Sequence, residues 1–177
     1  FAGPFPGPVP GSESNPDGRD LAVRDLDRAL GVGYGGRIYR ADGERWVSAN
    51  DGPTPHLTDL AVAHELAVAV GETSVLLSRD RGETWTEVPV ALPPVDEGYE
   101  DAFREWAAVA VPDAAHVRLG TKWGNVVASD DGGATWEERS TGLPLGVGGE
   151  DTDYSRPGIA LLHFLDADRG LAATRLR

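Results

Sequence analysis

Cysteine and methionine are both absent from the 177 residues, and lysine occurs once, at Lys122. Without cysteine the chain can form no disulfide and can hold no metal through thiolates. No apolar run approaches the roughly 20 residues that a membrane-spanning helix needs, so a helical span is excluded. The chain has 29 acidic and 16 basic residues and a formal net charge of −13. This balance argues against binding nucleic acid or an anionic membrane by bulk electrostatics.

The start of the chain has few core-forming side chains and is dense in proline and glycine. We predict that residues 1–19 form an extended tail ahead of the folded part. Because the sequence begins at Phe1 and not at Met, we expect a trimmed chain. Removal of an upstream signal peptide would account for the trimming.

An eight-residue pattern, S-x-D-x-G-x-T-W, occurs twice without a mismatch. Five residue types recur in one register, at Ser78, Asp80, Gly82, Thr84, Trp85 and at Ser129, Asp131, Gly133, Thr135, Trp136. Glycine permits a backbone conformation that a side chain disfavours, and the Asp, Ser and Thr oxygens can cap the N–H groups of a tight turn. Tryptophan buries a large ring between neighbouring sheets. We therefore expect these ten residues to be structural.

The sequence around each copy repeats as well. Short apolar runs bounded by Gly, Pro and Asp favour strands, for example 60–63, 67–70 and 75–77 before the first copy. The second copy follows runs at 107–111, 117–119 and 126–128, although a helical turn within 101–111 remains an alternative. A shortened repeat precedes the first copy and a fourth begins at Ile159. The four units cover about 20–50, 57–90, 105–140 and 158–177, the last one incomplete, and such a period with four short strands per unit is typical of a β-propeller blade.

The paired motif resembles the Asp-box, or bacterial neuraminidase repeat, whose family fold is a β-propeller. With the F-x-D-x-x-x-G pattern of Phe164, Asp166 and Gly170, the repeat is similar to that of photosystem II assembly-factor-like and sialidase-like proteins. The resemblance implies an all-β propeller of four-stranded antiparallel blades over residues 20–177, here about three and a half blades. Because propellers close with about 4–8 blades, we expect a partial ring, completed by another chain or a missing segment.

The resemblance also gives each loop an expected place. If the strands of a blade are a to d, the repeated motif occupies the c–d turn, and ligand-binding residues of Asp-box enzymes lie on the opposite face, which carries the b–c and d–a loops. Candidate binding residues on that face are Tyr34, Glu72, Tyr99, Glu100, Lys122, Trp123, Tyr154 and Arg156. Trp123 invites stacking with a sugar ring or a partner side chain, and packing against the neighbouring blade is an equally weighted alternative.

Two function classes follow. The first is a non-catalytic binding or assembly scaffold that docks a protein or glycan partner through the b–c and d–a loop face. The alternative is an exo-glycosidase of the sialidase type, whose site the rest of the ring would complete. Tyr99 and Glu100 do not form the Tyr–Glu pair of such enzymes by themselves, because neighbours on an extended strand point to opposite sides. We favour the scaffold and predict no catalytic residues.

No cofactor and no metal site is predicted. The oxygen-rich loops at 96–101 and 150–153 leave Ca²⁺ as an alternative, although the spacing of a known calcium motif is missing. The expected partners are a second polypeptide that completes the propeller and a protein or glycan ligand, with neither nucleic acid nor a membrane span. The resemblance to mostly exported families places the chain outside the cytoplasm.

Overall fold

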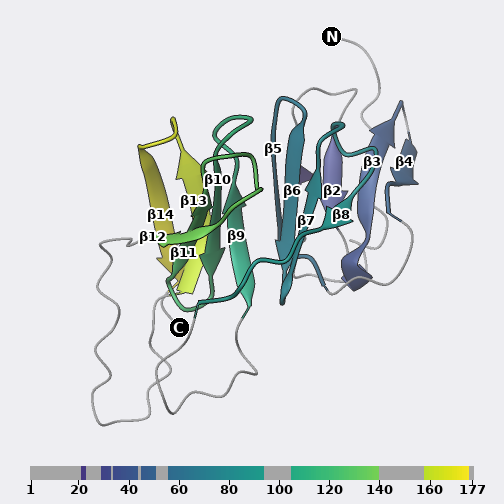
Figure 1. Cartoon of the computed structure of the whole chain (residues 1–177). Coiled ribbons are helices and arrows are strands. Elements are labelled where there is room, and N and C mark those ends of the chain that lie inside the picture. The colour runs from purple at the N-terminus through teal and green to yellow at the C-terminus, as the bar shows by residue number, and fades with distance from the viewer. Residues whose placement is uncertain are drawn as a thin grey trace.

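The computed structural model describes residues 21–22, 29–32, 34–43, 45–50, 56–93, 105–139 and 158–175. These residues form four antiparallel sheets in which strands consecutive in the chain pair with each other (Figure 1). The first sheet contains β1 (Leu21–Ala22), β2 (Leu30–Val32), β3 (Ile38–Asp42) and β4 (Arg45–Ser48). A single turn of 3-10 helix, η1 (Tyr34–Gly36), joins β2 to β3.

The next two sheets repeat this order. The second sheet contains β5 (Asp59–Ala63), β6 (Leu66–Gly71), β7 (Ser74–Ser78) and β8 (Thr86–Glu87). The third contains β9 (Trp106–Ala110), β10 (Val117–Thr121), β11 (Val126–Ser129) and β12 (Glu137–Arg139). The fourth contains two strands, β13 (Gly158–Phe164) and β14 (Gly170–Arg175). The apolar runs predicted as strands are strands, and residues 106–110 are not helical.

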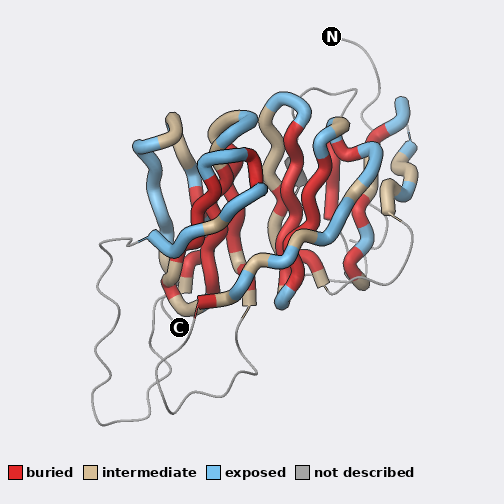
Figure 2. The backbone as a smooth tube through the Cα atoms, in the orientation of Figure 1, coloured by how far each residue is buried: buried red, intermediate tan, exposed pale blue. Residues whose placement is uncertain are grey.

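The sheets pack face to face, and the alternation of side chains along β6 shows how. Leu66, Val68 and Val70 face the third sheet, where they join Trp106 and Leu119 in one core. The small residues between them on β6, Ala67 and Ala69, face the first sheet and pack with Leu30 and Ile38. A strand covered on both sides reads as a continuous apolar run, because neither set of alternate side chains meets water. Figure 2 shows β6 buried throughout.

The first strands of successive sheets lie next to one another. β1 contacts β5, β5 contacts β9, and β9 contacts β13. Asp59 connects two of them, because its carboxylate accepts hydrogen bonds from the N–H of Leu60 at 2.9 Å and from the N–H of Val109 at 2.6 Å. First strands gathered on one side, with the later strands spreading away from them, give a radial arrangement of the sheets.

Candidate binding face

The two repeated turns join the third and fourth strands of the second and third sheets, as the motif predicts. In the first, the Ser78 hydroxyl donates to Asp80 Oδ1 at 2.7 Å and accepts from the Gly82 N–H at 2.8 Å. Asp80 also accepts from the N–H of Thr84 at 2.9 Å and from its hydroxyl at 2.5 Å. The second turn repeats these bonds between Ser129, Asp131, Gly133 and Thr135.

These hydrogen bonds change the acidity of both carboxyl groups. Burial acts to raise the pKa of Asp80, but the bonds from Thr84, Ser78 and Glu83 outweigh it and lower the pKa from 3.8 to about 2. The pKa of Asp131 is also lowered, first by the Thr135 hydroxyl, then by the Thr135 N–H and the Ser129 hydroxyl. Carboxylates whose oxygens are occupied inside a turn serve the fold, because a hydrogen-bonded anion is a poor proton carrier near neutral pH.

The turns also define one end of the molecule, here called the turn end. The Arg81 N–H donates to the Glu65 carbonyl at 3.0 Å and the Gly132 N–H to the Ala115 carbonyl at 2.6 Å. Each repeated turn is thus bonded to the turn between the first two strands of its own sheet. The connections between second and third strands lie at the opposite end, here called the loop end (Figure 1).

At the loop end, each connection between second and third strands reaches the start of the following sheet. The carbonyl of Glu72 accepts the Trp106 N–H at 2.7 Å. A Cβ on Gly158 would lie 2.2 Å from the Lys122 carbonyl oxygen, so this contact requires glycine. In the first sheet, the Gly35 N–H donates to His56 Nδ1 at 3.2 Å, just before β5.

The predicted site residues divide into three groups. Glu72, Lys122 and Trp123 lie at the loop end, at the connections that follow β6 and β10. Tyr34 begins η1, the corresponding connection of the first sheet. Tyr99, Glu100, Tyr154 and Arg156 lie outside the described residues. Glu72 is half-buried with a φ of +45°, and its backbone serves the contact between sheets.

Lys122 and Trp123 lie in the connection between β10 and β11, residues 122–125. Lys122 is exposed and its ammonium pairs with the Glu105 carboxylate, which precedes β9. Trp123 is half-buried, and its backbone N–H donates to the Thr121 hydroxyl at 3.2 Å. That hydroxyl also accepts the Asn125 N–H at 3.1 Å, so the turn is held from both sides. The arrangement holds an aromatic ring and a cation on a fixed turn.

Sequence reasoning did not select the residues that position these turns. Asn50 accepts the Ile38 N–H at 2.8 Å through its side-chain oxygen and donates to the Gly36 carbonyl at 2.8 Å. His56 accepts the Gly35 N–H, and the Glu105 carboxylate pairs with Lys122, so both side chains hold a turn that joins other strands. The partners of these three residues are 12 to 21 residues away in the chain. Nothing in their local sequence marks them, because each depends on how the sheets pack.

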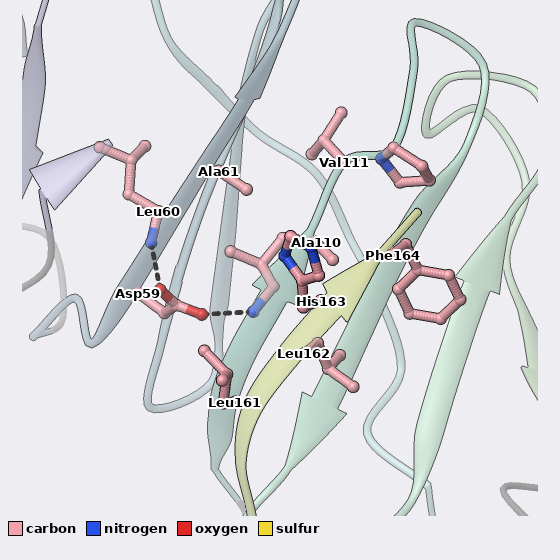
Figure 3. Close-up of a pocket in the computed structure, with 11 residues that line it drawn as sticks. Asp59, Leu60, Ala61, Ala110, Val111, Leu161, Leu162, His163 and Phe164 are labelled. Carbon is pink, nitrogen blue, oxygen red and sulfur yellow. Dashed lines mark hydrogen bonds between the residues drawn. The ribbon is translucent and has the colours of Figure 1, made fainter. Parts of the chain in front are cut away.

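A hollow of about 260 Å³ lies between the first strands of the second, third and fourth sheets (Figure 3). Its walls are mainly apolar, with Leu161, Leu162 and Phe164 on one side and Val109 to Pro112 on another. Asp59 and His163 add a carboxylate and an imidazole to this lining. Both Asp59 oxygens accept backbone N–H groups, so the carboxylate fixes β5 against β9.

Within the described ranges, no three or more His, Asp or Glu side chains are grouped so that they could hold a metal ion. The same part of the chain contains no helix of the length and apolarity that crossing a membrane requires.

No family model matches the chain, and no curated protein matches it either. Solved structures do. YCF48 bound to a D1 peptide aligns with 68% of this chain and 38% of its own, at 16% identity and a TM-score of 0.54. The GH74 xyloglucanase from Xanthomonas campestris aligns with 84% of this chain and 24% of its own, at 16% identity and a TM-score of 0.58.

A third structure, YCF48 from Cyanidioschyzon merolae, aligns with 88% of this chain and 66% of its own at 15% identity, with a TM-score of 0.40. The chain therefore spans 38%, 66% and 24% of the lengths of these three structures. The likeness to the first YCF48 structure and the xyloglucanase shows the fold. Together with the radial four-stranded sheets, it confirms a partial β-propeller with three complete sheets and one of two strands among the described residues.

Proposed function

We propose that this chain is a non-catalytic propeller scaffold that docks a protein partner through its loop end. The observation that carries the proposal is the placement of an aromatic ring beside an exposed cation on a fixed turn at the loop end. At the turn end, Asp80 and Asp131 are occupied by hydrogen bonds within their own turns. At the loop end, Lys122 is exposed and paired with Glu105, beside a half-buried Trp123, on a turn whose backbone N–H groups donate to the Thr121 hydroxyl.

The chemistry of that turn suits a peptide or protein ligand. Tryptophan is one of the residues most enriched at the energetic centre of protein interfaces. A rigid turn adds affinity because little conformational entropy is lost on binding. The two repeated turns match the Asp-box, which is consistent with a propeller whose ligand face lies opposite those turns. YCF48, which shares the fold, is solved with a bound D1 peptide, and this likeness supports a peptide ligand.

A peptide array probed with the labelled chain tests the proposal. We expect bound peptides to be at least about tenfold weaker ligands of Trp123→Ala, because loss of a central interface aromatic costs about 2 kcal/mol or more. Lys122→Gln should weaken binding less and reduce its salt dependence. Glu83→Gln is the matched control, because Glu83 is exposed at the turn end. Thermal melts verify that each variant is folded.

Two results would contradict the proposal. Equal affinity of the wild type and both loop variants would show that this turn does not carry the site. Turnover of aryl glycosides, including sialosides and xyloglucan oligosaccharides, would favour the glycosidase alternative. The shared fold of the GH74 xyloglucanase makes that screen the direct comparison.

A further inference from the structure

Asp–Gly dipeptides occur in the sequence at 17–18, 42–43, 51–52 and 131–132. Asp42–Gly43 and Asp131–Gly132 lie within the described residues, and each belongs to a turn between the third and fourth strands of a sheet. An Asp–Gly dipeptide can convert to isoaspartate without an enzyme, because glycine has no side chain to hinder the approach of its nitrogen to the neighbouring carboxyl group. The fold holds these two dipeptides in different ways.

In the third sheet, both reacting groups of the dipeptide are held by hydrogen bonds. The Asp131 carboxylate accepts from the Ser129 hydroxyl at 2.8 Å, and from the N–H and hydroxyl of Thr135 at 2.8 and 2.6 Å. The Gly132 N–H, which would be the nucleophile, donates to the Ala115 carbonyl at 2.6 Å. The Thr135 hydroxyl, followed by the other bonds, lowers the Asp131 pKa, so the carboxyl group stays ionised and its carbon is a poor electrophile.

In the first sheet, the corresponding groups are exposed and lack these bonds. Asp42 ends β3 and pairs with Arg45 at the start of β4, so the turn is shorter than the repeated motif and lacks its Ser and Thr. Asp42 and Gly43 are both exposed, and a Cβ on Gly43 would meet nothing within 4 Å. Across the part of the chain that the structure describes, no hydrogen bond or ion pair holds the Asp42 carboxylate or the Gly43 N–H.

A preceding sheet does not by itself cover an aspartate at this position. In the third sheet, the second sheet packs against the repeated turn, because a Cβ on Gly133 would lie 2.5 Å from Leu77. Asp131 is nevertheless exposed. The bonds that hold the Asp131–Gly132 dipeptide come from its own turn and from Ala115 of the same sheet. Bonds within a sheet therefore decide whether such a dipeptide can react.

We propose that Asp42–Gly43 is a site of spontaneous isoaspartate formation, and that the hydrogen bonds of the repeated turn protect Asp131–Gly132 from the same reaction. The backbone nitrogen of Gly43 attacks the side-chain carboxyl carbon of Asp42. A C–N bond forms and a C–O bond breaks, and the oxygen leaves as water with the amide proton and the proton of the carboxylic acid. Water then adds to the succinimide ring. Opening at the main-chain carbonyl gives isoaspartate, and opening at the side-chain carbonyl restores aspartate, so the net change is an isomerisation without an oxidant or cofactor.

Isoaspartate at this position would change the first sheet. The chain then continues through the side-chain carbon, which adds a methylene group to the backbone where β3 ends. The pairing of Ala41 with Trp46 and of Asp42 with Arg45 depends on the length of the turn, because turn length fixes the register of a hairpin. We expect the edge strand β4 to separate from β3 while the second and third sheets keep their structure. The site is remote from the loop end, so this proposal and the proposed function can each fail alone.

Incubation of the folded 177-residue chain in mildly acidic buffer, followed by tryptic digestion, tests the proposal. Cleavage after lysine and arginine places the two described dipeptides in fragments 41–45 and 123–139, and the other two in fragments 1–19 and 46–79. Chromatography separates the isomers of each fragment, and methylation by an isoaspartyl methyltransferase identifies isoaspartate. We expect isoaspartate to form at least about tenfold faster at Asp42 than at Asp131.

The same chain unfolded in urea is the matched control, because unfolding removes the bonds of the turns and keeps both sequences. There the two rates should agree within about threefold. In the folded chain, Gly43→Ala should slow the reaction at Asp42, and Thr135→Val should raise it at Asp131 by removing a donor to the carboxylate. Equal rates in the folded chain, no reaction at Asp42 in the folded chain, or a tenfold difference that persists in urea would each overturn the proposal.

Discussion

The turns at 78–85 and 129–136 are the best internal comparison that this protein offers. Four of their five shared residues, the Ser, Asp, Gly and Thr, form the same hydrogen bonds to within 0.1 Å, for example 2.7 and 2.8 Å from the serine hydroxyl to the aspartate. Their two glycines have φ angles of +85° and +90°. The two turns belong to different sheets and have different neighbours. The same bonds in different surroundings indicate that the Ser, Asp, Gly and Thr specify the turn locally.

The residues between the shared positions differ, and they connect each turn to its surroundings. The second position is Arg79 in one turn, where it donates to the Gly132 carbonyl of the other turn at 2.8 Å. In the other turn it is Asp130, which pairs with Arg118 at 2.8 Å and with Arg139 at 2.9 Å. The fourth position has a left-handed backbone in both turns, φ +65° at Arg81 and φ +72° at Gly132. The repeat thus fixes a shape, and the intervening residues adapt it to its place.

Replacing the glycine that the two turns share, Gly82 or Gly133, should have the largest effect on stability. Alanine at 82 or 133 would adopt a left-handed φ, and its Cβ would lie 2.6 Å from Leu30 or 2.5 Å from Leu77 of the preceding sheet. Strain and overpacking together should destabilise each variant by about 2–4 kcal/mol in urea unfolding. Gly43→Ala is the control, because its φ is +59° with nothing within 4 Å of the new methyl group. A loss as large in Gly43→Ala would show that strain alone accounts for the effect.

Replacing the buried serines should have the second largest effect on stability. Ser78 and Ser129 are each 1% exposed, and each hydroxyl connects the aspartate to the glycine N–H. Ser→Ala leaves a buried N–H without its acceptor, so each variant should lose about 1–3 kcal/mol. If the turns are equivalent, the two losses agree when measured in parallel melts. A loss confined to one turn would show that its neighbours, and not the shared residues, hold it.

Acid should weaken both turns together. The Asp80 pKa is about 2 in the folded chain and 3.8 in the unfolded chain, so the unfolded chain binds more protons between these pH values. The stabilisation is then complete above about pH 5 and decreases as the pH falls from about 4 towards 2. Asp131, with its pKa lowered likewise, shifts stability in the same direction. Asp80→Asn should show a smaller decrease in free energy of unfolding over this range, and an unchanged pH profile would exclude Asp80 as a source.

Exchanging arginine and glycine at the fourth position of the turns, Arg81 and Gly132, should have the smallest effect on stability. Arg81→Gly removes the cost of a left-handed arginine and loses only an exposed ion pair with Glu65. We expect a gain of about 0.5 kcal/mol in thermal unfolding. The reverse exchange, Gly132→Arg, should be destabilising, because a Cβ there would lie 3.0 Å from the Ala114 carbonyl. Destabilisation by Arg81→Gly would indicate that the Glu65 pair outweighs the strain.

The sequence predicted much of the fold because its signals are local and repeated. The packing of β6 between two sheets follows from Leu66, Val68 and Val70 on one face and alanines on the other, a pattern that extends over six residues. The loop-end candidates were harder to predict. Lys122 and Trp123 stand out by residue type, whereas His56, Asn50 and Glu105 bind backbone groups or side chains 12 to 21 residues away. Such partners become visible only when the sheets are placed side by side.

The sequence by itself determined the strands, their order in each sheet and the two repeated turns, because these depend on hydrogen bonds and side-chain alternation within about 30 residues. Only the tertiary structure decided which faces are covered. Leu66 and Leu171 are chemically the same residue on equivalent second strands, yet one is 3% and the other 72% exposed. Burial depends on the neighbouring sheet, and packing between sheets is a property of the whole assembly of strands.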